Sequence, residues 1–282
     1  MNYTEVGLDL QSLVKRIYQN LIYRSTFYKM LNDGYIGDLR TAGTPMIEVI
    51  KSKDAEINIR DTKEIETALT PALAGYDSVK VDLTELPMDY SIRIPVLVAG
   101  TNIVNALESA IEKKDSAVAL AIDTYGFGKL ADEVTEESAW APASAEDYIP
   151  LLNGLKANLF NKNVYETYRL ALSATEYANL VSALTSILKF ETMVGREGVD
   201  RGIVASAYGV EIFPVNDNVI GDVKGYFFNQ IAVVGDAFFD AFVQHNSPQG
   251  WPGYVVIEGN MLFGAKVVED QAIIKLVETP SA

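Results

Sequence analysis

The sequence predicts an α+β fold, because helical and strand patterns are interleaved without a regular βαβ repeat. The longest helical pattern covers Thr101–Leu130. Alternating apolar and polar residues, typical of strands, occur at residues 47–98 before it and at residues 201–277 after it. With 282 residues, 49% of them hydrophobic, the chain can bury a substantial core, which we expect to form two subdomains.

The first 46 residues are predicted to form an N-terminal arm. An apolar helical stripe runs from about Leu8 to Arg24, and a passage rich in tyrosine and glycine follows it. The arm either packs on its own domain or lies across a neighbouring molecule, and the pattern leaves both alternatives open. The acidic start has no basic-then-apolar signal, so we expect an intracellular protein.

Residues 47–98 are rich in strand patterns, and the simplest interpretation is a long β-hairpin. Ile57–Arg60 and Val79–Thr84 each alternate, and Asp61–Asp77 lies between them as a broad tip. A two-stranded ribbon alone is marginal in water, so a projecting hairpin would have to rest on another subunit. The alternative is two ordinary strands of a compact sheet.

The helix predicted over Thr101–Leu130 is amphipathic. Its apolar residues recur at three- and four-residue steps and so share one face, as do Ile103, Leu107, Ile111, Val118 and Ile122. Thr101 or Asn102 is expected to cap its start. At 1.5 Å per residue the helix is about 40 Å long. A rod of this length beside a two-stranded arm suits a subunit that tiles into a shell.

The stretch after this helix, Ala131–Asp147, is acidic and contains no Lys or Arg. Its carboxylates are Asp132, Glu133, Glu136, Glu137, Glu146 and Asp147. A charge run of this kind is usually a solvated loop, and its spacing does not match a calcium-binding loop. We therefore expect no metal site here.

The second half of the chain mixes strands and helices. A helix is predicted from Ser144 to about Asn161, then a strand over Tyr165–Leu172, then a helix opened by a capping box of Ser173 and Glu176. Strand patterns follow in four further stretches, at residues 201–215, 226–235, 254–259 and 264–277.

The sequence carries no recognisable catalytic motif. The chain has no cysteine and one histidine, His245, which no Gly-x-Ser-x-Gly elbow accompanies. Gly126–Lys129 is not a phosphate loop, because its spacing is wrong and Leu130 stands where Ser or Thr is needed. We therefore predict a protein that is not an enzyme, with no catalytic, cofactor-binding or metal-binding residues.

Net charge and hydropathy restrict the partners. Lys and Arg total 23 against 38 Asp and Glu, a formal charge of −15, which disfavours tight wrapping of nucleic acid. The charge is compatible with enclosing nucleic acid, because an acidic lining keeps the cargo from adhering. The longest apolar stretches, such as Ile94–Gly100, are too short to span a membrane.

Several stretches resemble the major capsid proteins of tailed double-stranded DNA bacteriophages. Tyr168–Leu184 (YRLALSATEYANLVSAL) and Gly202–Val215 (GIVASAYGVEIFPV) are similar to that family's strand, capped helix and small-residue strand with a Tyr-Gly turn. Ile231–Val243 and Gly259–Val268 resemble its closing strands. The order of parts agrees over most of the chain.

The resemblance implies a division of the chain. Residues 1–46 would be the N-terminal arm and residues 47–90 the extended loop. Residues 91–144 and 231–259 would form the peripheral domain with its spine helix at 101–130. Residues 145–230 and 260–282 would form the axial domain.

It also implies a role and partners. Subunits would assemble as hexamers and pentamers into an icosahedral shell around the double-stranded DNA genome, in the host cytoplasm, and remain in the virion capsid. A separate scaffolding protein, a portal and decoration proteins are the partners implied. Lys51, Lys53 and Lys63 lie where some members crosslink subunits, but no local motif identifies an asparagine partner, so crosslinking is not carried over.

Two alternatives stay open. An encapsulin-like compartment would share the fold and enclose a cargo enzyme instead of DNA. A soluble acidic hydrolase would use a pair of carboxylates in a cleft. For the capsid role we expect that deleting Met1–Gly43 leaves a folded core that no longer closes shells.

Overall fold

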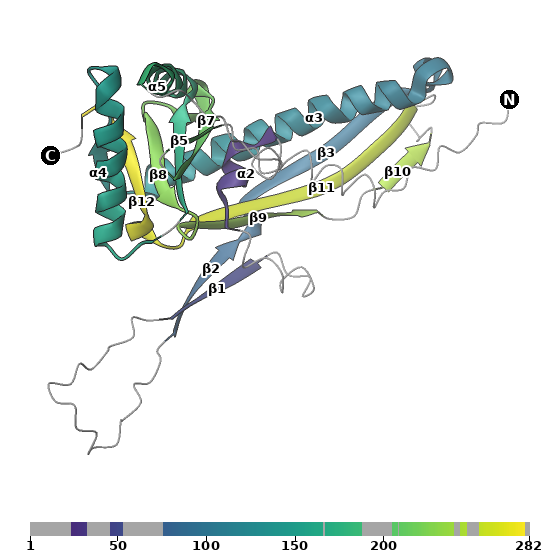
Figure 1. The fold of residues 1–282 in the computed structure, drawn as a ribbon. Helices are drawn as coiled ribbons and strands as arrows, with labels where there is room; N and C mark the ends of the chain where they lie inside the picture. The colour runs from purple at the N-terminus through teal and green to yellow at the C-terminus, as the bar shows by residue number, and fades with distance from the viewer. Residues whose placement is uncertain are drawn as a thin grey trace, which may run out of the picture.

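The computed structural model describes residues 24–32, 46–52, 76–165, 167–187, 205–207, 209–239, 243–246 and 254–279. They form a six-stranded sheet and a long four-stranded sheet, connected by one long helix, with a two-stranded ribbon leaving the body (Figure 1). Helices and strands alternate along the chain, which confirms the predicted α+β class.

The long helix, α3, covers Val96–Glu133 and lies along the four-stranded sheet (Figure 1). It begins at Val96 rather than at the predicted Thr101, and it ends at Glu133 rather than at Leu130. Its N-cap is Pro95, which makes no side-chain cap, so the predicted cap at Thr101 or Asn102 is wrong. Proline suits the start of a helix, where a backbone N–H would have no partner.

The four-stranded sheet is antiparallel throughout. It consists of β3 (Leu86–Pro95), β9 (Val233–Phe239), β10 (Val243–Asn246) and β11 (Tyr254–Val267). β11 pairs with β3 over residues 254–263 and with β9 over residues 261–267, so it binds the sheet together. The strand predicted at 254–259 is confirmed but continues unbroken to Val267, and the strand predicted at 264–277 is divided between β11 and a separate strand at Ile273–Val277.

The six-stranded sheet is mixed and has the order β4-β12-β8-β5-β7-β6. Its strands are β4 (Glu137–Ala139), β5 (Tyr168–Ser173), β6 (Ala205–Ala207), β7 (Val210–Val215), β8 (Gly225–Asn229) and β12 (Ile273–Val277). The stretch predicted as a strand at 226–235 is divided by a turn between β8 and β9. Each of its halves therefore belongs to a different sheet.

Helices cover this sheet on one face, and the end of α3 covers the other. α4 (Tyr148–Asn161) and α5 (Ala174–Ile187) lie beside it in Figure 1. Phe127 of α3 stacks on Tyr226 of β8 on the opposite face, whereas Phe227 stacks on Tyr168. Successive residues of a strand point to opposite faces, so the central strand β5 is buried at every position.

Short elements connect these parts. They are α2 (Thr26–Met30), η1 (Leu83–Glu85), η2 (Ala145–Asp147), α7 (Asp217–Ile220) and η3 (Asp270–Ala272). Half of the predicted capping box at α5 is present, because the Ser173 hydroxyl accepts from the Glu176 amide at 3.2 Å. The Ser173 amide donates to the Lys224 carbonyl instead, since Ser173 is still part of the sheet. Glu176 forms an ion pair with Lys224.

The two-stranded ribbon consists of β1 (Met46–Ser52) and β2 (Tyr76–Asp82), paired antiparallel from Met46↔Asp82 to Ser52↔Tyr76. We call this ribbon the arm. β2 confirms the alternation predicted from Val79. β1 is a further strand of the ribbon, and the strand predicted at Ile57–Arg60 lies outside the described residues. Asp77 belongs to β2, whereas the rest of the predicted tip up to residue 75 also lies outside them.

Candidate assembly surfaces

The base of the arm is anchored by an apolar cluster under the long sheet. Its buried members are Ile47, Val49, Val81, Leu83, Val234 and Val268. Gly264 of β11 lets the chain come close, because a Cβ at this position would overlap the Asp82 carbonyl. The arm is therefore fixed where it leaves the body.

A polar network beside this cluster joins η1 to α3. The Lys129 ammonium lies 2.6 Å from the Glu85 carboxylate, and the Tyr125 hydroxyl donates to the same group. The hydrogen bond from Lys129, followed by that from Tyr125, lowers the pKa of Glu85. The long helix thus holds the arm base by charge as well as by packing.

The opposite face of β1 is exposed, with Glu48 between the apolar side chains of Met46 and Ile50. Ile47 and Val49 point into the cluster, whereas Met46 and Ile50 are 42% and 63% exposed. Met46 lies opposite Asp82 at the base of the arm, whereas Ile50 lies opposite Ser78, nearer the outer end of the described pairing. Exposed apolar side chains on a projecting ribbon are candidates for contact with another molecule.

A second apolar patch lies at the C-terminal end of α4. Phe160 and Tyr165 pack edge to face at 5.0 Å between ring centroids and are 57% and 52% exposed. The Asn229 side chain donates to the Tyr165 carbonyl and accepts from the amide of Ile231, which is also exposed. The patch therefore joins α4 to the turn after β8.

Residues 24–32 of the predicted N-terminal arm pack against the body of the molecule. Phe27 and Met30 of α2 have 1% and 0% of their surface exposed, and Ser25 caps this short helix by accepting from the Tyr28 amide. Sequence reasoning missed this segment, because its five-residue helix is too short to produce a periodic signal. Ser25, a residue type that favours helix N-caps, is a local indication of this helix.

The acidic stretch at residues 132–147 consists of separate structural contacts. Glu136 pairs with Lys162, and Glu137 pairs with Lys275 at 2.8 Å. Asp147 accepts from the Ser144 amide at 2.7 Å in a capping box. The cations come from α4 and β12, which explains why the stretch itself contains none. Among the described residues no group of three potential metal ligands comes together.

The other residues weighed for chemistry are dispersed. His245 lies exposed in β10 opposite Val256, and Gly126–Lys129 forms part of α3. Lys51 lies in β1 opposite Asp77, whereas Lys53 and Lys63 lie outside the described residues. In the part of the chain that the structure describes, no helix is long and apolar enough to cross a membrane.

Comparison of sequences identifies no relative, because no protein-family profile and no curated protein matches the chain. Solved structures do match. A chain of Mycobacterium phage Che8 superposes with a TM-score of 0.60 at 17% identity, over 91% of this chain and 92% of the other. A chain from the capsid of Cyanophage P-SCSP1u superposes with a TM-score of 0.59 at 15% identity, over 85% of each chain.

The chain has the fold of bacteriophage capsid proteins. A virus-like particle from Pyrococcus furiosus shares this capsid fold, with a TM-score of 0.52 at 11% identity over 95% of this chain and all of the other. The described surface elements can therefore be interpreted as parts of a capsid fold. The predicted division of the chain between residues 259 and 260 falls inside β11, and β4 of the predicted peripheral part pairs with β12 in the six-stranded sheet.

Proposed function

We propose that this protein is a structural subunit of a closed shell, the major capsid protein of a tailed phage. The arm carries this proposal. It leaves the body with Met46 and Ile50 exposed, and burying an apolar side chain of this size contributes about 1.5–3 kcal/mol. A neighbouring subunit seated against this face would gain that free energy, and the capsid fold supports the same conclusion.

The finer assignment follows the capsid fold. The six-stranded sheet with α4 and α5 would be the axial domain, and α3 with the long sheet would be the peripheral domain. Such subunits would form hexamers and pentamers that enclose double-stranded DNA without reading its sequence. The formal charge of −15 supports enclosure rather than tight binding, because few cations are left to hold phosphates. A portal and a scaffolding protein would be the partners.

Electron microscopy of the purified protein tests the shell role directly. We expect closed shells, capsomer rings or tubes, with a separate scaffolding protein supplied if the subunit alone stays small. A protein that stays monomeric with its scaffold and with crowding agents would contradict the role. Nuclease-protected DNA inside shells from infected cells would identify the genome as the cargo.

The double variant M46S/I50S tests the arm surface. We expect a folded subunit with unchanged thermal unfolding but a several-fold higher concentration threshold for shells, because two contacts between subunits lose their apolar surface. The matched control M46L/I50V keeps both substituted side chains apolar and should assemble like wild type. Normal shells from M46S/I50S at wild-type concentrations would exclude this face from the lattice.

A second candidate is an encapsulin-like compartment, which the match to the virus-like particle from Pyrococcus furiosus favours. The two candidates share the shell and differ in the cargo. Shells that hold a co-purifying protein and no nuclease-protected DNA would support the compartment.

A further inference from the structure

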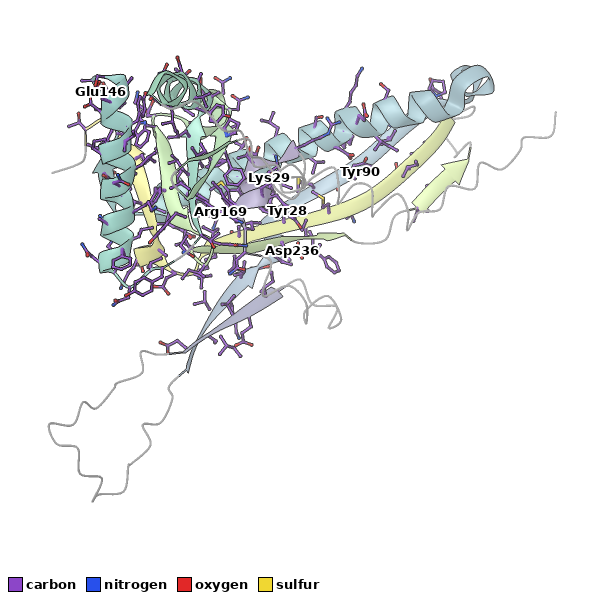
Figure 2. The ribbon with its side chains drawn as sticks, viewed as in Figure 1. Tyr28, Lys29, Tyr90, Glu146, Arg169 and Asp236 are labelled. Atoms are coloured by element: carbon purple, nitrogen blue, oxygen red, sulfur yellow. The ribbon has the colours of Figure 1, made fainter. Side chains whose placement is uncertain are left out.

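Residues 24–32 connect three parts of the molecule that are otherwise far apart in sequence. We call this segment the clasp. It touches α3, the six-stranded sheet and the long sheet, and Figure 2 shows Tyr28 and Lys29 close to Arg169 and Asp236. A segment in this position can influence how the two sheets are placed relative to one another.

The contact with α3 is centred on Asp123. Its carboxylate accepts from the Ser25 hydroxyl at 2.6 Å, from the Phe27 amide at 2.9 Å and from the Thr26 amide at 3.3 Å. These amides belong to the first turn of α2, where backbone donors have no partner within the helix. Asp123 therefore provides the hydrogen bonds that the short helix cannot make for itself.

The contacts with the two sheets are also polar. Arg169 of β5 donates to the Lys29 and Met30 carbonyls at 3.3 and 3.4 Å and pairs with Glu211 at 2.9 Å. The Tyr28 hydroxyl donates to Asp236 of β9 at 2.8 Å. The Asn32 amide donates to the Val233 carbonyl beside the same strand. Each sheet thus holds the clasp through separate groups.

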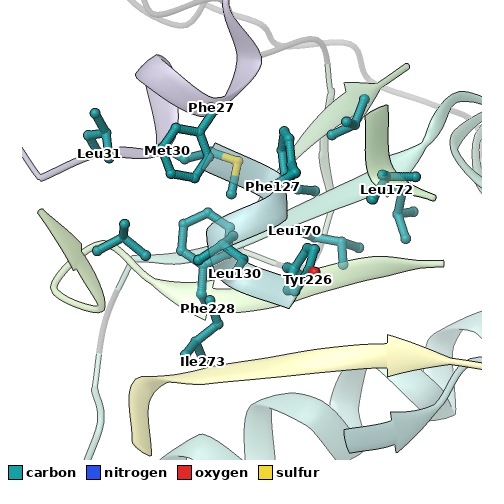
Figure 3. Close-up of a cluster of buried hydrophobic side chains, with 14 of the residues drawn as sticks. Phe27, Met30, Leu31, Phe127, Leu130, Leu170, Leu172, Tyr226, Phe228 and Ile273 are labelled. Carbon is teal, nitrogen blue, oxygen red and sulfur yellow. The ribbon is translucent and has the colours of Figure 1, made fainter. Parts of the chain in front are cut away.

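Phe27 is the apolar anchor of the clasp. Its ring packs edge to face on Phe127 and Phe263, and Figure 3 shows it above the cluster formed by Phe127, Leu130 and Tyr226. Gly126 of α3 makes room for it, because a methyl group at Gly126 would overlap the ring. Gly128 lies two residues further along α3 and so on nearly the opposite face of the helix. A methyl group at Gly128 would have no atom within contact distance.

Closure of the clasp has an electrostatic cost. Burial raises the pKa of Asp123 despite its three hydrogen bonds, and burial lowers the pKa of Lys29. Both shifts mean that the ionised groups lose hydration when the clasp is seated. Release would return both groups to water, and α2 is too short to stay helical alone. The favourable packing of Phe27 and the unfavourable desolvation therefore oppose one another.

We propose that residues 24–32 form a releasable clasp that sets the angle between the six-stranded sheet and the long sheet, closed by Phe27 seated on Gly126. When the clasp is closed, it bonds to Arg169 in the six-stranded sheet and to Asp236 in the long sheet, so the two sheets keep a single angle. With it open, the end of α3, the turn between β8 and β9 and the segment between β11 and β12 are the remaining connections. One chain can then adopt more than one curvature.

Matched glycine variants test this proposal. G126A displaces Phe27 without changing any clasp residue, whereas G128A adds the same methyl group where space is open. Because the protein has no cysteine, D89C and N153C can carry spin labels at exposed positions on β3 and α4. We expect one narrow distance distribution in the parent and in G128A, and a second distance in G126A. The parent distribution in G126A would overturn the proposal.

Hydrogen exchange provides a test in the unmodified protein. The amides of residues 26–28 should exchange by local opening, at least about tenfold faster than the amides of β5, and faster still in G126A. S25A, which removes one bond to Asp123, provides the same comparison should G126A fail to fold. Exchange of the residue 26–28 amides only together with β5 would show that the clasp never opens separately.

Discussion

Two buried tyrosines differ in how their hydroxyl groups are satisfied. Tyr90 of β3 donates to Asp115 of α3 at 2.9 Å, and both side chains are buried. Within the part of the chain that the structure describes, the buried hydroxyl of Tyr226 has no hydrogen-bond partner. A buried polar group without a partner loses its hydration and gains nothing in return. The two positions should therefore respond oppositely to loss of the oxygen.

The variants Y226F and Y90F test this difference. Y226F removes an unsatisfied hydroxyl, so the free energy of unfolding should stay equal or rise by about 1 kcal/mol. Y90F removes the hydrogen bond that Tyr90 donates to Asp115, so the free energy of unfolding of this variant should fall by about 1–3 kcal/mol. Denaturant unfolding followed by fluorescence or circular dichroism measures both. Equal destabilisation by the two variants would mean that Tyr226 has a partner after all.

Single residues also show the limits of prediction from sequence. The acidic stretch was interpreted as a solvated loop, whereas its ion pairs with Lys162 and Lys275 could not be foreseen. These lysines lie in distant elements that only the fold brings together. The contact of Asp123 with the clasp could not be foreseen either, because its partners also come from far away in sequence.

At the scale of elements, strong periodic patterns predicted which helices and strands form, whereas tertiary contacts determined where each of them ends. The long helix and the alternation of β2 were recognisable because each buries one face. The helix start was placed too late, because Val96–Gly100 has no polar residue to mark a helical face. β11 was predicted as two strands because Gly259, Asn260 and Gly264 are typical of turns. Gly264 is needed for another reason, because a side chain there would overlap the Asp82 carbonyl at the base of the arm.

The arm base should respond to pH through Glu85. Its folded-state pKa is lowered, so its contribution to stability is present above its ordinary pKa of 4.5 and is lost as the pH falls through the lower value. Because Glu85 is partly exposed, the contribution is small, on the order of 0.5 kcal/mol. The difference in unfolding free energy between wild type and E85Q should be present near neutrality and should disappear once the pH has fallen below the lowered pKa of Glu85. A difference that persists at low pH would contradict the ion pair as its source.

At the scale of the whole molecule, the clasp and the arm have opposite roles. The clasp buries Phe27, Met30 and Leu31 within its own subunit, whereas the arm keeps Met46 and Ile50 exposed. The clasp and the β1 strand of the arm lie within the first 52 residues. For residues 1–46 the sequence left open whether they pack on their own domain or lie across a neighbour. A subunit built in this way would separate the setting of its shape from its contacts with neighbours.

Two deletions distinguish these roles and refine the expectation for removal of Met1–Gly43. Deleting residues 1–23 keeps the clasp, so the subunit should unfold like wild type. Deleting residues 1–32 also removes Phe27, and loss of a buried Phe side chain alone costs about 3–5 kcal/mol. We expect this second truncation to unfold at a much lower temperature or to aggregate, as circular dichroism and sizing chromatography would show.

Assembly provides the second readout for these truncations. If residues 1–23 lie across a neighbouring subunit, the shorter deletion should yield folded subunits that no longer close shells in electron micrographs. Closed shells from the variant that lacks residues 1–23 would mean that the arm formed by β1 and β2 suffices for shell closure. Equal thermal stability of the two truncations would show that the clasp does not hold the body together, because the longer one lacks every contact of Phe27 with α3 and β11.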